Sequence, residues 1–335
     1  MPIARLNMVE LKDIVNDIRN YPGITRKRDI GHLVGMLSGA QGSVSSPVVT
    51  GFGEDAAAIS YGDHYLLLAA EGMWPRFVSA EPYAAGKAAV TASVNDIYAM
   101  GGRPLALVNV LSVSTGDERV QIMEGIRKGC QKLMVPMVGG HLNPDAREPS
   151  LSVAILGTAR SLLRSTNARG GEKIVLAVDL SGGLGQCTSV VSWDAHSGKT
   201  SDYLVERLSL LPLVAEAGLC KTAKDVSNGG IAGTVSLLCE YSGTGALLIL
   251  DDIPRPPQME LMSWLKAFLS YGFILCVEEP SLPLCLDAFR RKGIAAAVIG
   301  EICSERRVIL RYHGDEEVLF DFSRESITGI PHRES

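Results

Sequence analysis

Apolar residues recur along the chain with two spacings, one typical of helices and one typical of strands. The alanine-rich segment 84–100 has apolar positions three or four residues apart, which predicts a helix. Gly101-Gly102 then supplies a left-handed stop. The β-branched, apolar run 105–113 that follows predicts a strand covered on both faces.

Similar patterns predict further elements on either side of this helix. An apolar face near the N-terminus indicates a helical arm within residues 1–50, whose first helix ends at Pro22-Gly23. The later segments alternate between short apolar runs and amphipathic stretches. We expect strands near 65 and at 135–138, 151–159, 173–179, 246–250, 275–278, 296–302 and 308–312, and helices at 115–133, 203–217, 231–241 and 282–292.

A polar, turn-rich segment at 161–172 separates two of the predicted strands and marks a domain boundary. A chain of 335 residues with 46% hydrophobic content is long enough to form two cores. We therefore expect an N-terminal arm over residues 1–50, a first domain over 51–165 and a second domain over 166–335.

Composition narrows the possible partners and compartment. The net charge of −5 provides no general attraction to nucleic acid or to an anionic membrane. The seven cysteines are scattered without a CxxC pair, which favours core thiols in a reducing cytosol over disulfides or zinc. No secretion signal is evident, and no apolar run approaches the ~20 residues of a membrane span, so we expect a cytoplasmic protein.

Acidic residues in three places are candidate ligands for a cation. Asp96 lies on the small, apolar surface of the alanine-rich helix, where burial is costly unless a cation or hydrogen-bond donors meet it. Glu54 and Asp55 follow a glycine-rich turn, and Glu71 ends the next apolar run. Carboxylate oxygens are the hard ligands that Mg²⁺ prefers. Taken alone, however, acidic residues at a turn are typical of a solvated loop.

The segment KDVSNGG at 224–230 is a candidate phosphate contact. Asn228-Gly229-Gly230 leads into a predicted helix, whose N-terminus would present backbone N–H groups to an anion. Asp225 precedes this turn, and taken by itself it is interpreted as a cap of that helix.

Two positively charged segments need separate interpretation. Lys27, within a run of three cations at 26–28, either folds over the phosphates of a nucleotide or belongs to a solvated turn. The sequence SGKT at 197–200 resembles the end of a phosphate-binding P-loop. Because Trp193 occupies the position of the first glycine and no apolar strand leads directly into the segment, we do not interpret it as one.

Taken together, the motifs resemble those of the AIR synthetase superfamily. SVNDIYAMGGRP, which contains Asp96, resembles the superfamily's helix signature, and GFGEDAAAIS, a predicted Gly139-Gly140-His141 turn and KDVSNGG match further signatures in order. The resemblance extends from about residue 50 to 312. It implies a PurM-like fold with an α+β first domain, a ferredoxin-like half-barrel that pairs with a second copy to form a homodimer, and an α/β second domain.

Members of this superfamily bind ATP with magnesium, and the resemblance implies roles for individual residues. It makes Asp96 and Asp225 the catalytic pair, and lets His141 face the nucleotide or substrate, although a turn histidine bonded to backbone is the alternative. The expected metal ligands are Glu54, Asp55, Glu71, Asp96 and Asp225. The expected cofactor contacts are Lys27, Asn95, Gly139, Gly140, His141, Asn228, Gly229 and Gly230.

The chain departs from the superfamily pattern where relatives hold their substrates. Glu54 and Glu71 stand where relatives carry Asp, and 269–273 replaces a glycine-rich substrate motif. The sequence therefore predicts ATP-dependent phosphoryl transfer to, or activation of, an oxygen of an undetermined small molecule. A nucleotide-binding or regulatory protein without turnover is the alternative.

Overall fold

A computed structural model describes residues 10–38, 47–185 and 190–330, so parts of the expected arm lie outside the described residues. Within the described part of the arm, three helices follow one another: α1 (Leu11–Asn20), α2 (Pro22–Thr25) and α3 (Ile30–Ser38). No helix in the described ranges is long and apolar enough to cross a membrane.

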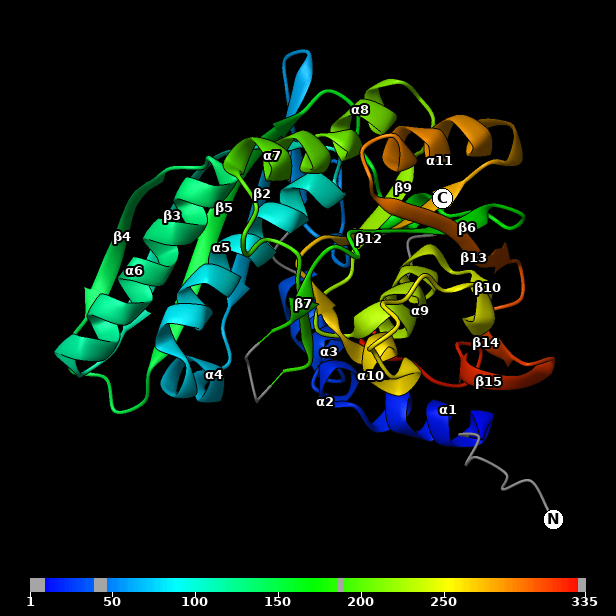
Figure 1. Ribbon diagram of the computed structural model, residues 1–335, viewed down its shortest axis with the longest axis horizontal. Coiled ribbons are helices and arrows are strands. Elements are labelled where there is room, and N and C mark those ends of the chain that lie inside the picture. The colour runs from blue at the N-terminus through cyan, green and yellow to red at the C-terminus, as the bar shows by residue number, and fades with distance from the viewer. Residues whose placement is uncertain (1–9, 39–46, 186–189, 331–335) are drawn as a thin grey trace.

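The N-terminal unit is a five-stranded sheet with helices on one face (Figure 1). Its strand order is β1-β2-β5-β3-β4, and all neighbours are antiparallel except β3 and β4. The bounds are β1 (Ala57–Tyr61), β2 (His64–Gly72), β3 (Arg103–Ser112), β4 (Met137–Asn143) and β5 (Ser150–Ala159). The helices are α4 (Pro75–Ala80), α5 (Pro82–Ala99) and α6 (Gly116–Leu133).

No part of the chain within the described residues covers the second face of this sheet. In β3, Leu107 and Leu111 are buried beneath the helices, whereas Val108 and Val110 are 43% and 46% exposed. The expectation that 105–113 is covered on both faces was therefore wrong. The error arose because apolar residues occupy the outward positions as well as the inward ones, so the usual polar alternation of a one-sided strand is missing.

The expected turn at Gly139-Gly140 is also wrong, because both residues lie within β4. Glycine is required there by a close approach of backbone and side chain rather than by a turn. A Cβ on Gly140 would lie 2.3 Å from Oδ1 of Asn109 in the neighbouring strand. The predicted strand at 135–138 begins two residues later than expected, at Met137.

The C-terminal unit is built on a seven-stranded mixed sheet with the order β15-β14-β10-β13-β6-β12-β9. Helices α8 and α11 lie on one side of it and α9 and α10 on the other (Figure 1). The strands are β6 (Lys173–Val178), β9 (Thr222–Asp225), β10 (Gly245–Ile249), β12 (Gly272–Val277), β13 (Ala295–Cys303), β14 (Arg307–Tyr312) and β15 (Asp315–Asp321). The helices are α7 (Ser201–Leu208), α8 (Leu210–Glu216), α9 (Gly230–Ser242), α10 (Leu261–Lys266) and α11 (Leu282–Arg290).

Two details of this unit differ from the expectation or add to it. The single helix expected at 203–217 is divided into α7 and α8 at Ser209, because Pro212 has no N–H to continue the helical hydrogen bonds. A small third sheet joins β7 (Gly183–Leu184), β8 (Ser192–Asp194) and β11 (Phe268–Leu269), and it faces the N-terminal unit across a cavity.

The arm packs on the C-terminal unit. Arg19 in α1 forms a two-point ion pair with Glu325, at 2.9 and 2.5 Å, and also donates to the carbonyl of Leu319. The backbone N–H of Gly31 donates to the carbonyl of Thr328 at 2.7 Å. These contacts fix the position of α2 and of the positive segment that follows it.

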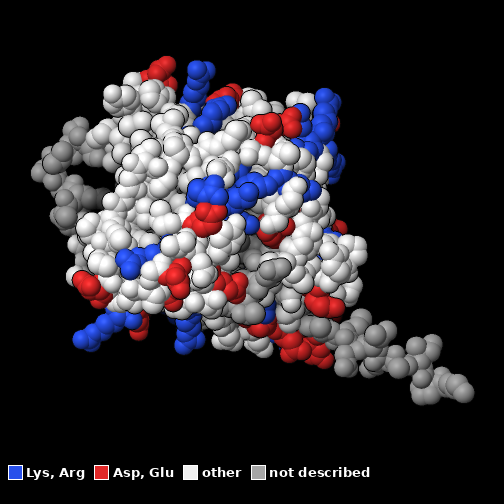
Figure 2. Space-filling model, turned by 60° about the vertical axis from the view of Figure 1, so that its left-hand side comes forward, with Lys and Arg blue, Asp and Glu red and all other residues white. Residues whose placement is uncertain are grey.

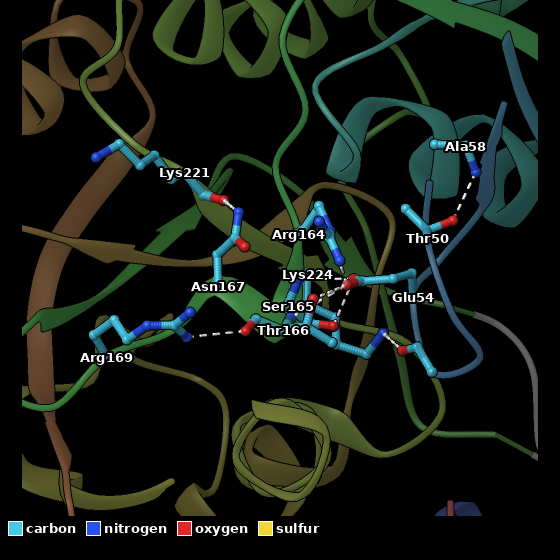
Figure 3. A network of polar contacts seen from close by, with 11 residues as sticks. Thr50, Glu54, Ala58, Arg164, Ser165, Thr166, Asn167, Arg169, Lys221 and Lys224 are labelled. Carbon is cyan, nitrogen blue, oxygen red and sulfur yellow. Dashed lines mark hydrogen bonds and ion pairs between the residues drawn. The ribbon is translucent and has the colours of Figure 1, made fainter. Parts of the chain in front are cut away.

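Glu54 ties the N-terminal unit to the linker between the two sheets (Figure 3). Its side chain is 1% exposed. One carboxylate oxygen accepts from the N–H and hydroxyl of Ser165 at 2.7 and 2.6 Å, and the other accepts from those of Thr166 at 3.2 and 2.7 Å. Arg164 lies 3.8 Å away. Because both oxygens are engaged in this network, Glu54 is a buried anchor of the linker.

We predict that Glu54→Gln destabilises the fold by about 1.5–3 kcal/mol, because an amide group would turn its own N–H donors toward the donors of Ser165 or Thr166. Thermal and denaturant unfolding measure the change. The matched control is Glu148→Gln, on the exposed loop between β4 and β5, which should stay within about 0.5 kcal/mol of the parent. Equal stability of the two variants would show that the network contributes nothing.

Candidate functional site

A cavity of about 1050 Å³ lies between the two units. One wall is the small-residue face of α5, and the opposite wall comes from the third sheet and from the loops at 181–185 and 194–199. The small side chains Ala84, Ala88 and Ala92 leave this space open, because they recur at the helical spacing along α5.

Three carboxylates from distant parts of the chain converge at one end of the cavity. Asp55 precedes β1, Asp96 lies near the end of α5, and Asp225 ends β9. Each offers an oxygen, and these oxygens all lie within 4.8 Å of one another. Asp96 is 6% exposed and Asp225 is 3% exposed. Glu71, at the end of β2, lines the same end of the cavity. We call Asp55, Asp96 and Asp225 the acidic cluster.

Burial and mutual repulsion make the acidic cluster a poor place for unneutralised charge. Burial raises the pKa of Asp96 well above its ordinary value, and the charges of Glu71, Asp225 and Asp55 raise it further. The pKa of Asp225 is raised well above its usual range by burial and then by Asp55. The pKa values of Asp55 and Glu71 are also raised, chiefly by burial.

Two lysines partly balance the acidic cluster. The ammonium of Lys224 forms an ion pair with Asp55, and both side chains are less than a tenth exposed. Burial is the largest single effect and would lower the pKa of Lys224, but the charges of Asp55, Tyr241 and Asp225, with the hydrogen bond to Asp55, together outweigh it and raise the pKa. Lys27 lines the cavity, and burial followed by the charge of Lys224 lowers its pKa.

The residues of the acidic cluster fit a hard divalent cation. Oδ2 of Asp225 is buried and has no hydrogen-bond partner among the described residues, so it is available as a ligand. Lys224 engages only one oxygen of Asp55, and the other accepts weakly from the N–H of Asp225 at 3.3 Å. Oxygen ligands from three carboxylates are the donor set that Mg²⁺ prefers. Asp55, Asp96 and Asp225 would hold the ion, and Glu71 lies beside them. Glu54, expected among the ligands, faces the linker instead.

The turn after β9 only partly matches the geometry expected of an anion contact. Asn228 lines the cavity, whereas Gly229 and Gly230 lie behind it at the start of α9. Gly230 has φ +65°, and a Cβ there would meet the carbonyl oxygen of Leu265 at 2.2 Å. The N-cap of α9 is Gly229, and no side chain caps it, so the interpretation of Asp225 as a helix cap was wrong.

Other expected contacts lie elsewhere in the structure. Asn95 donates to the carbonyl of Ser270 at 3.1 Å and so ties α5 to the C-terminal unit. Gly139 and His141 pair in register with Val108 and Val110, which places them on the uncovered face of the sheet, away from the cavity. Within the arm, Lys27 reaches the cavity, while the guanidinium of Arg26 lies over the ring of Trp74 at 4.0 Å.

Several residues that line the cavity or contact the acidic cluster were not singled out from the sequence. Lys224 was overlooked although it directly precedes Asp225. Lys87 is the single basic residue on the alanine-rich helix, which is the kind of exception that marks a site. His196 and Lys199 lie in the loop whose P-loop resemblance was rejected. That loop follows a three-residue strand and is not a P-loop, yet it lines the cavity.

Comparison with known proteins gives two matches to one family along the chain. Residues 53–159 match the N-terminal domain of AIR synthase related proteins, and residues 169–313 match the C-terminal domain. An uncharacterized protein of Synechocystis sp. is 36% identical over 320 residues, which cover 96% of this chain and 98% of that protein. Selenide, water dikinase of Photorhabdus laumondii is 26% identical over 284 residues, covering 78% of this chain and 80% of the dikinase.

Solved structures share the fold. Thermotoga maritima PurL complexed with ATP superimposes with a TM-score of 0.70 at 22% identity, over 90% of this chain and 53% of PurL, so the chain spans about half the length of that protein. A chain of the HypE–HypF complex gives a TM-score of 0.64 at 17% identity, over 87% of this chain and 100% of that one. The PurM-like two-domain fold is thereby confirmed, and the chain belongs to the AIR synthase related family.

Proposed function

We propose that the cavity binds ATP together with Mg²⁺. The observation that carries the proposal is the acidic cluster, three buried carboxylates with oxygens within 4.8 Å of one another beside a lysine-lined cavity. Asp55, Asp96 and Asp225 hold the ion, which would neutralise charge on the phosphates. Support comes from relatives, since PurL has been solved in complex with ATP in a similar fold and a selenide, water dikinase is 26% identical over 78% of this chain.

Residues from different parts of the chain bind and orient the nucleotide. Lys27 and Asn228 contact the phosphates from the arm and the C-terminal unit. Lys224 holds one oxygen of Asp55 and so orients that carboxylate toward the ion. Such a clamp stabilises the charge that develops in phosphoryl transfer, to which preorganised electrostatics make the main contribution. The proposed reaction is ATP-dependent phosphoryl transfer to, or activation of, a small-molecule oxygen.

A nucleotide-binding protein without turnover is the second candidate. It is favoured by the segment at 269–273, where relatives hold substrate. Here Ser270 is engaged by the fold, because its hydroxyl accepts from the N–H of Ala195 at 2.8 Å and its carbonyl accepts from Asn95. Release of ADP or phosphate from ATP and Mg²⁺ by purified protein, abolished in Asp96→Asn, would decide for an enzyme.

We expect Asp96→Asn to weaken magnesium-dependent nucleotide binding by about ten- to a hundredfold, because one charge-assisted contact is lost. Isothermal titration with a non-hydrolysable ATP analogue and Mg²⁺ measures the affinity. The matched control is Asp145→Asn, on an exposed loop. Unchanged affinity in Asp96→Asn would remove Asp96 from the metal site.

The same variant should be more stable than the parent when divalent ions are absent. Because the pKa of Asp96 is raised in the native state, that state holds a proton that the unfolded chain releases. Stability therefore falls as pH rises through the window above the ordinary carboxyl pKa of about 4. Asp96→Asn removes one contribution to this fall, so melting temperatures from pH 4.5 to 8 in a chelator should decline less steeply. An equally steep decline would show that burial and the neighbouring charges do not raise the pKa of Asp96 in the native state.

If Lys27 contacts phosphates, nucleotide should protect the arm from trypsin. Cleavage after the exposed Arg28 should slow when Mg²⁺ and the ATP analogue are added, because the phosphates hold Lys27 in the cavity. Cleavage after Arg147, on the exposed β4–β5 loop, is the internal control and should keep its rate. Equal cleavage rates at Arg28 with and without nucleotide would show that the positive segment 26–28 does not contact the phosphates.

We propose that the uncovered face of the five-stranded sheet forms a homodimer. Apolar side chains from three strands are exposed on that face, and contiguous apolar patches of this kind mark interfaces. They are Leu68, Val108, Val110 and Leu156. The superfamily resemblance supports the same pairing.

In sedimentation at micromolar concentration, the parent should therefore be a dimer and Val110→Glu a monomer, because a charge would be buried unpaired in the interface. Val120→Glu, on the outer face of α6 where Val120 is 69% exposed, should remain dimeric. A monomeric parent would refute the interface.

A further inference from the structure

The cavity has a second charged end, opposite in sign to the acidic cluster. Four lysines line the cavity here, and we call them the lysine end: Lys87, Lys128, Lys132 and Lys199. Lys87 and Asp96 are both on α5, nine residues apart, which is about 13.5 Å along the helix axis. That separation exceeds the Debye length of about 8 Å at physiological ionic strength. The lysine end is therefore placed to act on something other than the acidic cluster, whose charge Lys27 and Lys224 already oppose. On the face of the molecule that Figure 2 draws, Lys and Arg side chains gather in a band across the middle.

The ammonium groups at this end have mainly neutral partners. Lys199 donates to the hydroxyl of Ser181 at 2.9 Å and lies 4.9 Å from the centre of the Tyr203 ring. Lys132 contacts the carbonyl oxygen of Lys199. Lys87 donates to the hydroxyl of Ser197 at 3.3 Å. Half-buried charges of one sign that share a cavity repel one another, and an anion between them would remove that cost.

One of the carboxylates near these lysines, that of Asp194, is already engaged by hydrogen bonds within its own loop. Asp194 accepts from the backbone N–H groups of His196 and Ser197 at 2.8 and 2.9 Å, and from the hydroxyl of Ser197 at 2.5 Å. Its distance to the ammonium of Lys87 is 3.8 Å. Asp194 therefore shapes the loop at 194–199 and leaves the lysine end with a positive balance.

His196 adds a polar group that lacks a partner. The residue is 5% exposed and lines the cavity, and its Nε2 has no hydrogen-bond partner within the described residues. Burial lowers the pKa of His196 to about 4, against the opposing charge of Asp194, so the ring is neutral at physiological pH. A neutral imidazole nitrogen buried without a partner carries a cost that a hydrogen-bonding ligand would remove.

We propose that the lysine end binds the phosphate group of a phosphate monoester, the second substrate of the reaction, through Lys87, Lys132 and Lys199, with Nε2 of His196 as a polar contact. The assignment as a substrate rests on the proposed function. A compact dianion suits several converging ammonium groups, which bind phosphate as point charges. The phosphates of the nucleotide belong at the acidic cluster, about half the length of α5 away, so different parts of α5 serve the two ligands.

The test is isothermal titration of the full chain with glycerol 3-phosphate, with and without saturating Mg²⁺ and ATP analogue. Lys199→Met and Lys87→Met should each weaken glycerol 3-phosphate binding about tenfold or more, and should change nucleotide affinity less than threefold. Asp96→Asn should show the reverse pattern. Lys221→Met, a control on the exposed end of β9 with its side chain 69% exposed, should alter neither affinity. Melting temperatures confirm that each variant is folded, and the two lysine variants check one another.

Three results would overturn the proposal. The first is no binding of glycerol 3-phosphate to the parent. The second is a loss of nucleotide affinity in Lys199→Met with glycerol 3-phosphate binding unchanged. That result would show that these lysines bind the nucleotide instead. The third is equally tight binding of succinate, which would replace phosphate recognition by carboxylate recognition. Titration without nucleotide separates the two proposals, because the lysine end can bind glycerol 3-phosphate even if Asp96→Asn leaves nucleotide affinity unchanged.

Discussion

The arrangement of the molecule depends on the cost of burying three carboxylates together. Asp55, Asp96 and Asp225 come from the start of the first sheet, its main helix and the edge strand of the second sheet. A lone buried carboxylate is strongly unfavourable, and three that share one site repel one another as well. Lys224 offsets part of this cost from within the C-terminal unit, and Lys27 from the arm. The N-terminal unit, the C-terminal unit and the arm therefore meet at one electrostatic centre, and none of them completes it alone.

The contacts around the acidic cluster keep the two units in a fixed relation. Glu54 binds the linker with both oxygens, and its neighbour Asp55 faces the cluster. Asn95 likewise binds the C-terminal unit, and its neighbour Asp96 faces the cluster. In each pair, one polar side chain holds the interface and the adjacent one serves the site. The cavity is thus formed by contacts that do not require a ligand.

These pairs also explain how far the sequence could predict the site. Asp96 was identifiable because an acidic residue on a small-residue helix is unusual. The order of the motifs along the chain then assigned Asp55 and Asp225 to the same site. Glu54 could not be separated from Asp55, since the direction of each side chain depends on the turn and on partners more than a hundred residues away. Gly139-Gly140 was interpreted as a turn because a glycine needed for close strand contact has the same sequence signature. The lysine end was missed because its members are far apart in the sequence, and the fold itself was recognised through its motifs rather than through strand patterns.

The docking of the arm has a consequence for the order in which the protein is completed during synthesis. Arg19 and Gly31 are among the earlier described residues to leave the ribosome, yet their partners Leu319, Glu325 and Thr328 lie near the other end of the chain. Domains generally fold as they emerge, N-terminal part first. Here α1 cannot reach its final place until β15 and the segment after it have been translated, so Lys27 enters the cavity only after the C-terminal unit has emerged. A nascent chain therefore carries the acidic cluster without its full cationic balance until translation has reached the segment that receives the arm.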